Sequence, residues 1–304
     1  MPRSLSAQTL VAVVAAASLG LVGCGGGGSS SSSKAPTTVI QNKGSDTMVN
    51  VAQAWAEQYR TAAPNVEVEV SGGGSGVGIA ALVKGAIDIA NASRDIKPDE
   101  IEQAKKNNAG KEPVGFTVGH DGLAVYVHKT NPIDEISIEQ LAAIFAEDGK
   151  ATRWSEVGIK IPGVKDDTIV RVSRQSSSGT YEFFREHVLG KKDFKMGSRD
   201  LNGSKEVVEL VGSTPTAIGY SGMGYATAAV KMLRVSPKTG APGVAPTVEN
   251  TTSKAYPLAR SLHVYTLGQP QGAVKAYIDW ILSPAGQKIL AESGYVPIGP
   301  GDKR

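Results

Sequence analysis

Apolar residues along the chain follow two alternating spacings, which predict strands and helices that take turns. Val66, Val68 and Val70 are separated by polar residues, and this two-residue period is typical of a half-buried strand. Val51, Trp55 and Tyr59 instead recur at four-residue steps, as on the buried face of an amphipathic helix. Because such patterns alternate nearly throughout, the sequence predicts an α/β fold with mainly parallel sheets.

The same patterns give approximate bounds for the expected elements. Strands are expected at 38–41, 66–70, 87–90, 113–118, 123–127, 168–173, 217–222 and 262–267. Helices are expected after Met48 and over 79–84, 98–106, 137–146, 181–189, 207–211 and 271–293, the last with a break at Pro284. Residues 236–250 are rich in Pro, Gly and Thr, so a long loop is expected there.

One expected strand-to-helix turn carries more polar groups than a connection needs. Arg174–Thr180, with the sequence RQSSSGT, follows a β-branched run and precedes a helical pattern that ends at Gly190. Its hydroxyls, Gly and Arg therefore lie where a helix leaves backbone N–H groups unpaired. Such a helix start attracts anions, and an Arg fork fits a tetrahedral oxyanion. Taken alone, the turn would more often be an ordinary helix cap.

Similar helix starts occur twice more, and this repetition favours an anion site over an ordinary cap. Gly44–Met48 (GSDTM) follows the first expected strand and opens the first helix. Ser71–Gly78 (SGGGSGVG) leads into helix 79–84, and its glycines let backbone N–H groups approach a ligand closely. A further polar loop, Ala92–Asp95, runs from a strand into Ser, Arg and Asp.

Length and charge narrow the function classes. The chain has 304 residues, enough for two domains, and is 40% hydrophobic and 20% charged, as in an ordinary soluble protein. Its formal net charge is only +3, and the charges are dispersed. Because no basic stripe with interleaved aromatic residues occurs, no nucleic-acid partner is expected.

Sequence motifs for enzyme chemistry are weak or missing. Gly76–Ala81 matches G-x-G-x-x-A, but five residues separate it from the preceding strand and no acidic residue ends the next strand. The chain contains neither a P-loop nor a G-x-S-x-G nucleophile elbow. Its four histidines lack close metal-ligand spacing. We therefore expect no enzyme activity, no cofactor and no metal.

The single cysteine, Cys24, follows a signal-like N-terminus. Arg3 precedes the mostly apolar run Leu10–Val22, which is too short to span a bilayer as a helix. The run ends in Leu21–Cys24, which resembles the lipobox of a bacterial lipoprotein, so residues 1–23 are the expected signal peptide and Cys24 the lipidated residue. The alternative is an ordinary secretory signal with a chance Cys.

The residues after Cys24 are expected to tether a folded body to a membrane. Gly25–Ser33 consists only of Gly and Ser, which form a flexible linker and cannot form a core. We expect residues 24–36 to be the lipidated Cys and its tether. Several acyl chains on one residue give stable anchoring. The predicted location is the periplasm or cell envelope, with the protein lipid-anchored to a membrane.

The polar helix starts, in order, resemble those of a known family. Gly44–Thr47, Gly74–Gly76, Ala92–Asp95 and the Arg174–Thr180 pattern R-x-x-x-S-G-T are similar to the PstS-like phosphate-binding proteins of bacterial phosphate ABC transporters. The resemblance extends from about Thr37 to Ser293. It implies a type II periplasmic-binding-protein fold: two lobes, each a mixed, mainly parallel sheet flanked by helices, with the ligand cleft between them.

The resemblance also implies domain limits and partners. Lobe 1 would comprise residues 37–122 and 260–304, and lobe 2 residues 123–259, with the chain crossing near Asp121–Val125 and Ala259–Val264. The expected ligand is inorganic phosphate, and the expected protein partners are the permease subunits of an ABC transporter. A monomer is the default for such a receptor.

Carried over position by position, the resemblance assigns phosphate-binding residues to both lobes. Those in lobe 1 would be Ser45, Asp46, Thr47, Ser75, Gly76, Ser93, Arg94 and Asp121. Those in lobe 2 would be Arg174, Ser178, Gly179 and Thr180. Many members of the family have an acidic residue where this chain carries Arg94, so another carboxylate must accept the hydrogen bond of the phosphate proton. The candidates are Asp46, Asp95 and Asp121. Our hypothesis is that Asp121 or Asp46 does so, with Arg94 and Arg174 offsetting the ligand charge.

Three other functions stay open from sequence. One is a surface interaction lipoprotein that keeps this fold without binding the ligand. A receptor for another tetrahedral oxyanion, such as sulfate or molybdate, would need the same donors. An exported phosphatase with Ser75 or Ser178 as nucleophile is less favoured, because no paired base or metal cluster accompanies either serine.

Overall fold

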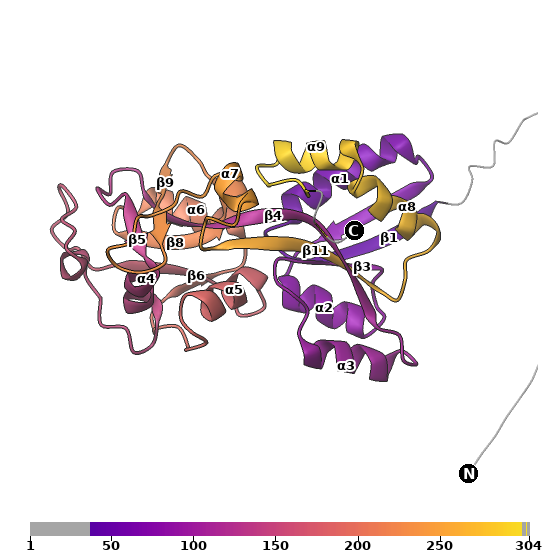
Figure 1. The fold of residues 1–304 in the computed structure, drawn as a ribbon, viewed down its shortest axis with the longest axis horizontal. Coiled ribbons are helices and arrows are strands. Elements are labelled where there is room, and N and C mark those ends of the chain that lie inside the picture. The colour runs from indigo at the N-terminus through magenta and orange to yellow at the C-terminus, as the bar shows by residue number, and fades with distance from the viewer. Residues whose placement is uncertain (1–36, 300–301, 303–304) are drawn as a thin grey trace, which may run out of the picture. The chain divides into compact units, whose positions relative to one another are not determined.

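The structure is a computed structural model that describes residues 37–299 and 302 (Figure 1). The expected signal peptide, Cys24 and the tether lie outside these residues. No helix in the described part is both long enough and apolar enough to cross a membrane.

Helices and strands alternate through most of the described chain. The helices are α1 (Val49–Ala62), α2 (Ser75–Val83), α3 (Pro98–Asn107), α4 (Ile138–Phe145), α5 (Gly179–His187), α6 (Ser204–Ser213), α7 (Val248–Thr252), α8 (Gly272–Ile281) and α9 (Pro284–Glu292). The strands are β1 (Thr38–Gly44), β2 (Val66–Ser71), β3 (Ile89–Ala92), β4 (Pro113–His128), β5 (Glu135–Ser137), β6 (Val170–Arg174), β7 (Arg199–Leu201), β8 (Ala217–Gly222), β9 (Val230–Met232), β10 (Arg234–Ser236) and β11 (Ala259–Leu267).

Two long strands, β4 and β11, connect the two parts of the main sheet. The strands of this sheet follow the order β2-β1-β3-β11-β4-β8-β6-β7, and β9 also pairs with β4, whereas β5 and β10 form a separate two-stranded sheet. Figure 1 shows β4 and β11 running between the two parts of the main sheet. Pairs at the two ends of this order are parallel, whereas every pair that involves β4 or β11 is antiparallel. Along β4, Gly122 still pairs with β11, and Leu123 already pairs with β8.

The expectation that Gly119–Gly122 separates two strands is wrong, because β4 runs through it without a break. The glycines meet a packing need instead of a turn. A Cβ on Gly119 would lie 2.4 Å from a Leu290 methyl, and one on Gly122 would lie 3.1 Å from the Met223 sulfur. The expected loop 236–250 is also shorter, since the Thr247 side chain caps α7 by accepting the Asn250 N–H.

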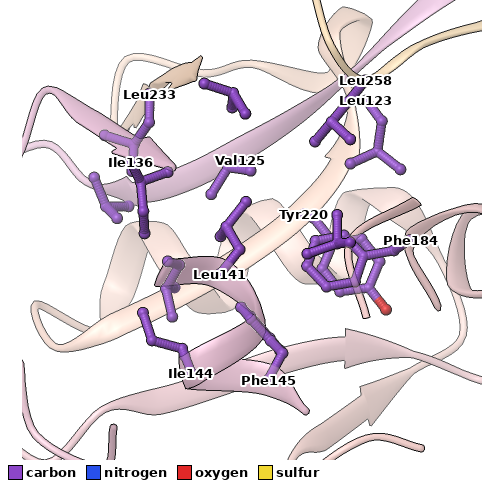
Figure 2. Close-up of a cluster of buried hydrophobic side chains, with 14 of the residues drawn as sticks. Leu123, Val125, Ile136, Leu141, Ile144, Phe145, Phe184, Tyr220, Leu233 and Leu258 are labelled. Carbon is purple, nitrogen blue, oxygen red and sulfur yellow. The ribbon is translucent and has the colours of Figure 1, made fainter. Parts of the chain in front are cut away.

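Buried apolar side chains form separate clusters whose limits follow the crossing strands. The largest cluster contains residues between Leu123 and Leu258, including the stacked rings of Phe184 and Tyr220, with centroids 3.9 Å apart (Figure 2). A second cluster joins residues from 40–118 to residues from 262–295. These clusters support the predicted lobes, which we keep as a proposal; below, lobe 1 and lobe 2 denote the residue ranges given above.

Candidate functional site

The starts of α2 and α5 meet in direct backbone contact. The Gly76 N–H donates to the Ser177 carbonyl at 2.9 Å, and the Ser177 hydroxyl donates to the Gly73 carbonyl at 3.0 Å. Gly74 has a φ of +99°, which favours glycine, and a Cβ there would lie 2.5 Å from the Ser177 carbonyl oxygen. The predicted helix starts of lobe 1 and lobe 2 therefore lie together, and only glycine permits their approach.

Three serine hydroxyls from lobe 1 gather at this contact. Ser45 Oγ donates to Ser93 Oγ at 3.0 Å, and Ser75 Oγ lies 3.3 Å from Ser93 Oγ. The Ser93 N–H also donates to Ser75 Oγ at 3.1 Å. Gly179 of lobe 2 closes over them, since a Cβ there would lie 2.3 Å from Ser75 Oγ and 2.7 Å from Ser93 Oγ. The buried residues Ser45, Ser75 and Ser93, together with Thr47 and Thr180, are called the hydroxyl cluster below.

The two threonines extend the cluster across the lobes. Thr47 Oγ1, before α1, lies 2.8 Å from Thr180 Oγ1, in the first turn of α5, and both residues are buried. Ser178 contributes differently, because its oxygen caps α5 by accepting the N–H groups of Thr180 and Tyr181. Its oxygen is thereby committed to the helix, and only its hydroxyl hydrogen is available to a ligand.

Backbone donors remain available at both helix starts. None of the hydrogen bonds among residues 37–299 and 302 uses the backbone N–H of Ser75 or Gly179. Both residues occupy the first position of a helix, where no intrahelical acceptor exists. These N–H groups add to the positive ends of two helix dipoles.

One buried ion pair joins the lobes at the site. The Arg174 guanidinium, fully buried, contacts Asp46 Oδ2 at 3.2 Å, the Asn202 carbonyl at 2.7 Å and Ser204 Oγ at 3.0 Å. The Gly73 N–H donates to the other Asp46 oxygen at 2.8 Å. Burial lowers the pKa of Arg174, and the Asp46 charge opposes this shift. Arg174 Nε has no partner among the described residues, so this buried cation keeps an unused donor.

A second buried ion pair lies beside the first on the crossing strands. Arg260 donates twice to Asp121 Oδ2, at 2.7 and 3.0 Å, and the Met223 N–H donates to Asp121 Oδ1 at 3.1 Å. Burial raises the pKa of Asp121, and the charge of Arg260 opposes that rise. The predicted site residue Asp121 is thus near the cluster, with three donors already on its carboxylate.

Arg94 is the predicted residue whose charge is directed elsewhere. Its guanidinium makes a bidentate pair with Glu100, with N–O distances of 2.6 and 2.9 Å, and also donates to the Asp95 carbonyl. Glu100 belongs to the first turn of α3, and its carboxylate also accepts the Lys97 N–H. The structure therefore uses Arg94 to hold the loop between β3 and α3, and brings its neighbour Ser93 into the cluster.

Sequence reasoning missed Arg260 and two tyrosines that support the site. Tyr225 donates its hydroxyl to the carbonyls of Asp46 and Thr47, at 3.0 and 3.2 Å, and Tyr295 also donates to Thr47. Burial raises the pKa of Tyr225 to about 12, so its hydroxyl keeps its hydrogen. The available signal for Arg260 was its place in the predicted crossing segment Ala259–Val264, whereas Tyr225 and Tyr295 carry no distinctive spacing.

A cavity of about 770 Å³ borders the site, and Arg94, Phe183 and Arg260 are among its lining residues. Three of the four histidines, His120, His187 and His263, also line it. Within the described residues no group of His, Cys, Asp or Glu side chains has the geometry to hold a metal ion. The hydroxyl cluster is separate from this cavity, because Ser45, Thr47, Ser75, Ser93 and Thr180 are not among its lining residues.

Comparisons with known sequences agree with this geometry. A family model described as a PBP superfamily domain matches residues 31–285. The phosphate-binding protein PstS of Pseudomonas aeruginosa is 34% identical over 273 residues, which are 85% of this chain and 83% of the relative. Protein SphX of Synechococcus elongatus is 34% identical over 277 residues, 87% of this chain and 79% of the relative.

Solved structures show the same architecture. A Clostridium perfringens substrate-binding protein, solved with bound phosphate, aligns with 86% of this chain and all of its own, at a TM-score of 0.75 and 30% identity. An ABC-type phosphate transport receptor from Vibrio cholerae covers 85% of this chain and all of its own, at a TM-score of 0.67 and 28% identity. The predicted α/β architecture, that of type II periplasmic binding proteins, is confirmed.

Proposed function

The chain belongs to the PstS-like family of the periplasmic-binding-protein superfamily, and from this premise we propose that it captures inorganic phosphate outside the cytoplasm for a phosphate ABC transporter. Members of this family bind and release a solute without chemical change. The permease subunits of such a transporter are its proposed protein partners.

One observation carries the proposal: donors from two lobes converge on one buried place that also holds a cation. The hydroxyl cluster brings oxygens of both lobes together, Ser75 and Gly179 begin the two helices that meet there, and Arg174, with its spare Nε, pairs with Asp46 next to Thr47. Neutral N–H and O–H donors at helix starts solvate an anion without a large net charge. Because the two starts touch directly, the lobes must separate for a ligand to enter.

Asp46 is the carboxylate that we propose accepts the hydrogen bond of the phosphate proton. Each Asp46 oxygen has one donor, Gly73 N–H or Arg174, so free lone pairs remain, whereas Asp121 already accepts three hydrogen bonds. At neutral pH phosphate carries a proton that sulfate lacks. A carboxylate that meets sulfate would therefore face an unprotonated oxygen, at a cost of about 1–3 kcal/mol or more.

Binding measurements test the function directly. Titration calorimetry of the ligand-free protein with phosphate should give tight binding of one phosphate per chain, and sulfate or molybdate should compete poorly. Asp46→Asn should narrow the preference for phosphate over sulfate by about tenfold, the equivalent of 1.4 kcal/mol. Equal or tighter binding of sulfate by the unaltered protein would replace phosphate with another oxyanion, and the absence of any oxyanion binding would reject the receptor function.

The proposal includes closure of two lobes about the crossing strands. The predicted limits are 37–122 with 260–304 and 123–259, and the separate apolar clusters on either side of Gly122 support them. A few residues at a strand crossing can absorb the change in backbone angles on closure. Small-angle scattering should show a smaller radius of gyration when phosphate is added to the ligand-free protein, and no change with chloride. A single radius under both conditions would contradict closure.

We also propose that Cys24 carries the lipid that holds the protein at a membrane. Support comes from the position of the only cysteine, directly after an apolar run and the sequence Leu21–Gly23. In a bacterial host, the unaltered protein should fractionate with membranes, and Cys24→Ala should move it to the soluble fraction. Equal partition of both forms would reject the anchor and leave the binding function untouched.

A further inference from the structure

The Arg260–Asp121 pair is built into the crossing strands. Arg260 and Asp121 stand directly opposite each other in the β4–β11 ladder, and their side chains are 2% and 0% exposed. Two N–H groups of the guanidinium reach one carboxylate oxygen, at 2.7 and 3.0 Å. The guanidinium is thus fixed in position and orientation by its neighbour on the adjacent strand.

The remaining donors of Arg260 point to the hydroxyl cluster. Its Nη1 donates to the Ser93 carbonyl at 3.3 Å, and its Nη2 lies 3.5 Å from Thr47 Oγ1. The aromatic ring of Phe183, in α5 of lobe 2, lies 5.6 Å from the guanidinium carbon. Arg260 therefore touches both the loop that carries Ser93 and the helix start that carries Thr47.

These contacts set the direction of hydrogen bonding within the cluster. A hydroxyl that accepts an N–H bond on its oxygen directs its own hydrogen to another acceptor. Thr47, with Arg260 at its oxygen, is thereby favoured as a donor toward the place it shares with Thr180. Holding the Ser93 carbonyl fixes the turn whose hydroxyl meets Ser45 and Ser75. A site for an anion needs hydroxyl groups that donate hydrogen bonds to it. The contacts of Arg260 favour this orientation for the Thr47 hydroxyl.

Stability alone does not account for this arrangement. Replacing a buried ion pair by neutral groups of similar size is often neutral or stabilising, so such a pair is weak evidence of a purely structural role. A structural pair also needs no donors beyond the carboxylate, yet Arg260 directs two of its groups to the cluster. The position of the pair beside Thr47 and Ser93 indicates a role in binding.

We propose that Arg260, anchored by Asp121, is a positioning residue of the anion site, which holds Thr47 and Ser93 as donors to the bound oxyanion. The inference rests on the proposed phosphate-binding function. It assigns Asp121 to the anchoring of Arg260 rather than to the phosphate proton. It also places a second guanidinium, whose charge is balanced by Asp121, near the site, in addition to that of Arg174.

A pair of variants tests the proposal, with the phosphate dissociation constant of the unaltered protein as reference. The double variant Asp121→Asn/Arg260→Gln removes both charges and leaves no buried ion without a partner. We expect its phosphate Kd to rise at least tenfold. Arg260→Lys keeps the charge and one contact to Asp121 but loses the fork, so its Kd should lie between those of the double variant and the unaltered protein. Arg153→Gln/Asp167→Asn, which removes another Arg–Asp pair with N–O distance 2.7 Å, is the matched control and should bind normally.

Melting temperatures without phosphate separate binding from folding. If the double variant and Arg260→Lys keep the Kd of the unaltered protein while their melting temperatures change, Arg260 is structural and the inference is wrong. If the double variant does not fold, Arg260→Lys alone decides, because wild-type Kd in that variant overturns the inference and a weakened Kd supports it. Failure of the unaltered protein to bind phosphate would reject the proposed function itself, and this inference with it.

Discussion

The two buried Arg–Asp pairs of the site differ in how firmly they are held. Asp121 and Arg260 face each other on adjacent strands, and both are almost completely enclosed. Asp46 and Arg174 come from different lobes, meet through a single 3.2 Å contact, and leave the Asp46 side chain 14% exposed. The Nε of Arg174 has no partner among the described residues, whereas the Nε of Arg260 donates to Asp121. Asp121 also accepts the Met223 N–H on its other oxygen.

This difference indicates a division of labour between two chemically similar pairs. A pair within one ladder persists whether the lobes are open or closed, so it can only hold its surroundings in place. In the closure proposed above, a pair that spans the lobes would form only when they meet, and its single 3.2 Å contact would let an entering anion share the donors. The Arg174–Asp46 pair is therefore the one that we expect to rearrange with the ligand.

The largest expected effect separates the two aspartates by stability. Asp121→Asn leaves Arg260 buried without a counter-charge, which should lower the free energy of unfolding by about 3–5 kcal/mol. Asp46→Asn should lower it less, by about 1–3 kcal/mol, because Asp46 makes a single 3.2 Å contact to Arg174 and its side chain is partly exposed to solvent. Urea unfolding without phosphate measures both values. Equal losses in the two variants would contradict the difference between the pairs.

The fold was predictable from sequence wherever periodic patterns were long. The paired helices α8 and α9, with the break before Pro284, follow the expected pattern closely. The one strand that was divided wrongly, β4, contains Gly119 and Gly122, which normally interrupt a strand. Pairing with β11 on one side and β8 on the other overrides that local preference, and no local pattern reports such long-range pairing.

The site was predictable only where helix starts carry a local signature. Ser45, Thr47, Ser75, Gly179 and Thr180 belong to such starts, and the structure brings them together. Arg260 lies 139 residues from Asp121, so their pairing depends on strand register, which the sequence does not display. The direction of the Arg94 side chain likewise depends on Glu100. The turn between β3 and α3 brings these two residues together, and the sequence does not show that turn's geometry.

The next largest effect concerns phosphate binding by the Arg174–Asp46 pair, which is held less firmly than Arg260–Asp121. Arg174→Gln removes the only positive charge that lobe 2 brings to the contact with Asp46, including the spare Nε. Loss of charge-assisted hydrogen bonds should weaken phosphate binding by about 3 kcal/mol, or roughly 150-fold in Kd. Calorimetry gives the Kd, and Arg153→Gln serves as the control for removing an Arg of lobe 2. A change below about threefold would show that Arg174 does not face the ligand.

A smaller effect should follow from keeping the lobes apart. Gly179→Ala places a methyl group 2.3 Å from Ser75 Oγ, a distance that forces the hydroxyl cluster to move. Overpacking of this kind costs about 1–3 kcal/mol, so phosphate Kd should rise about tenfold, while the ligand-free melting temperature stays nearly constant. Gly299→Ala is the matched control, because its new methyl would come no closer than 3.8 Å to another atom. If Gly179→Ala binds as tightly as the control, the observed contact is not part of the bound state.

The smallest expected effect tests whether the stability of the crossing strands around the Arg260–Asp121 pair depends on pH. His263 lies on β11 three residues after Arg260, its Nε2 is 3.1 Å from Asp95 Oδ1, and His120 is a nearby second histidine. Burial lowers the pKa of His263, Asp95 opposes the shift, and His120 adds to it. Because the pKa is lower in the folded chain than the usual value near 6.5, the unfolded chain binds the proton more readily. His263 therefore contributes stability above about pH 6.5, and that contribution is lost as the pH falls through the folded-state pKa.

His263→Gln should remove this contribution to the pH dependence. Between pH 7.5 and 5, the melting temperature of the unaltered protein without phosphate should fall more than that of the variant, because only the unaltered protein loses the His263 contribution. His128→Gln is the matched control, since among the described residues the hydrogen bonds of the His128 ring go to Thr130 alone, and His128 lies at the end of β4 away from Asp121. If both variants match the unaltered protein at every pH, the crossing strands do not respond to this histidine. If instead His263→Gln also weakens phosphate binding at pH 7.5, where the imidazole is neutral, then the position of the Arg260–Asp121 pair depends on the neighbouring His263 as well as on the β4–β11 pairing.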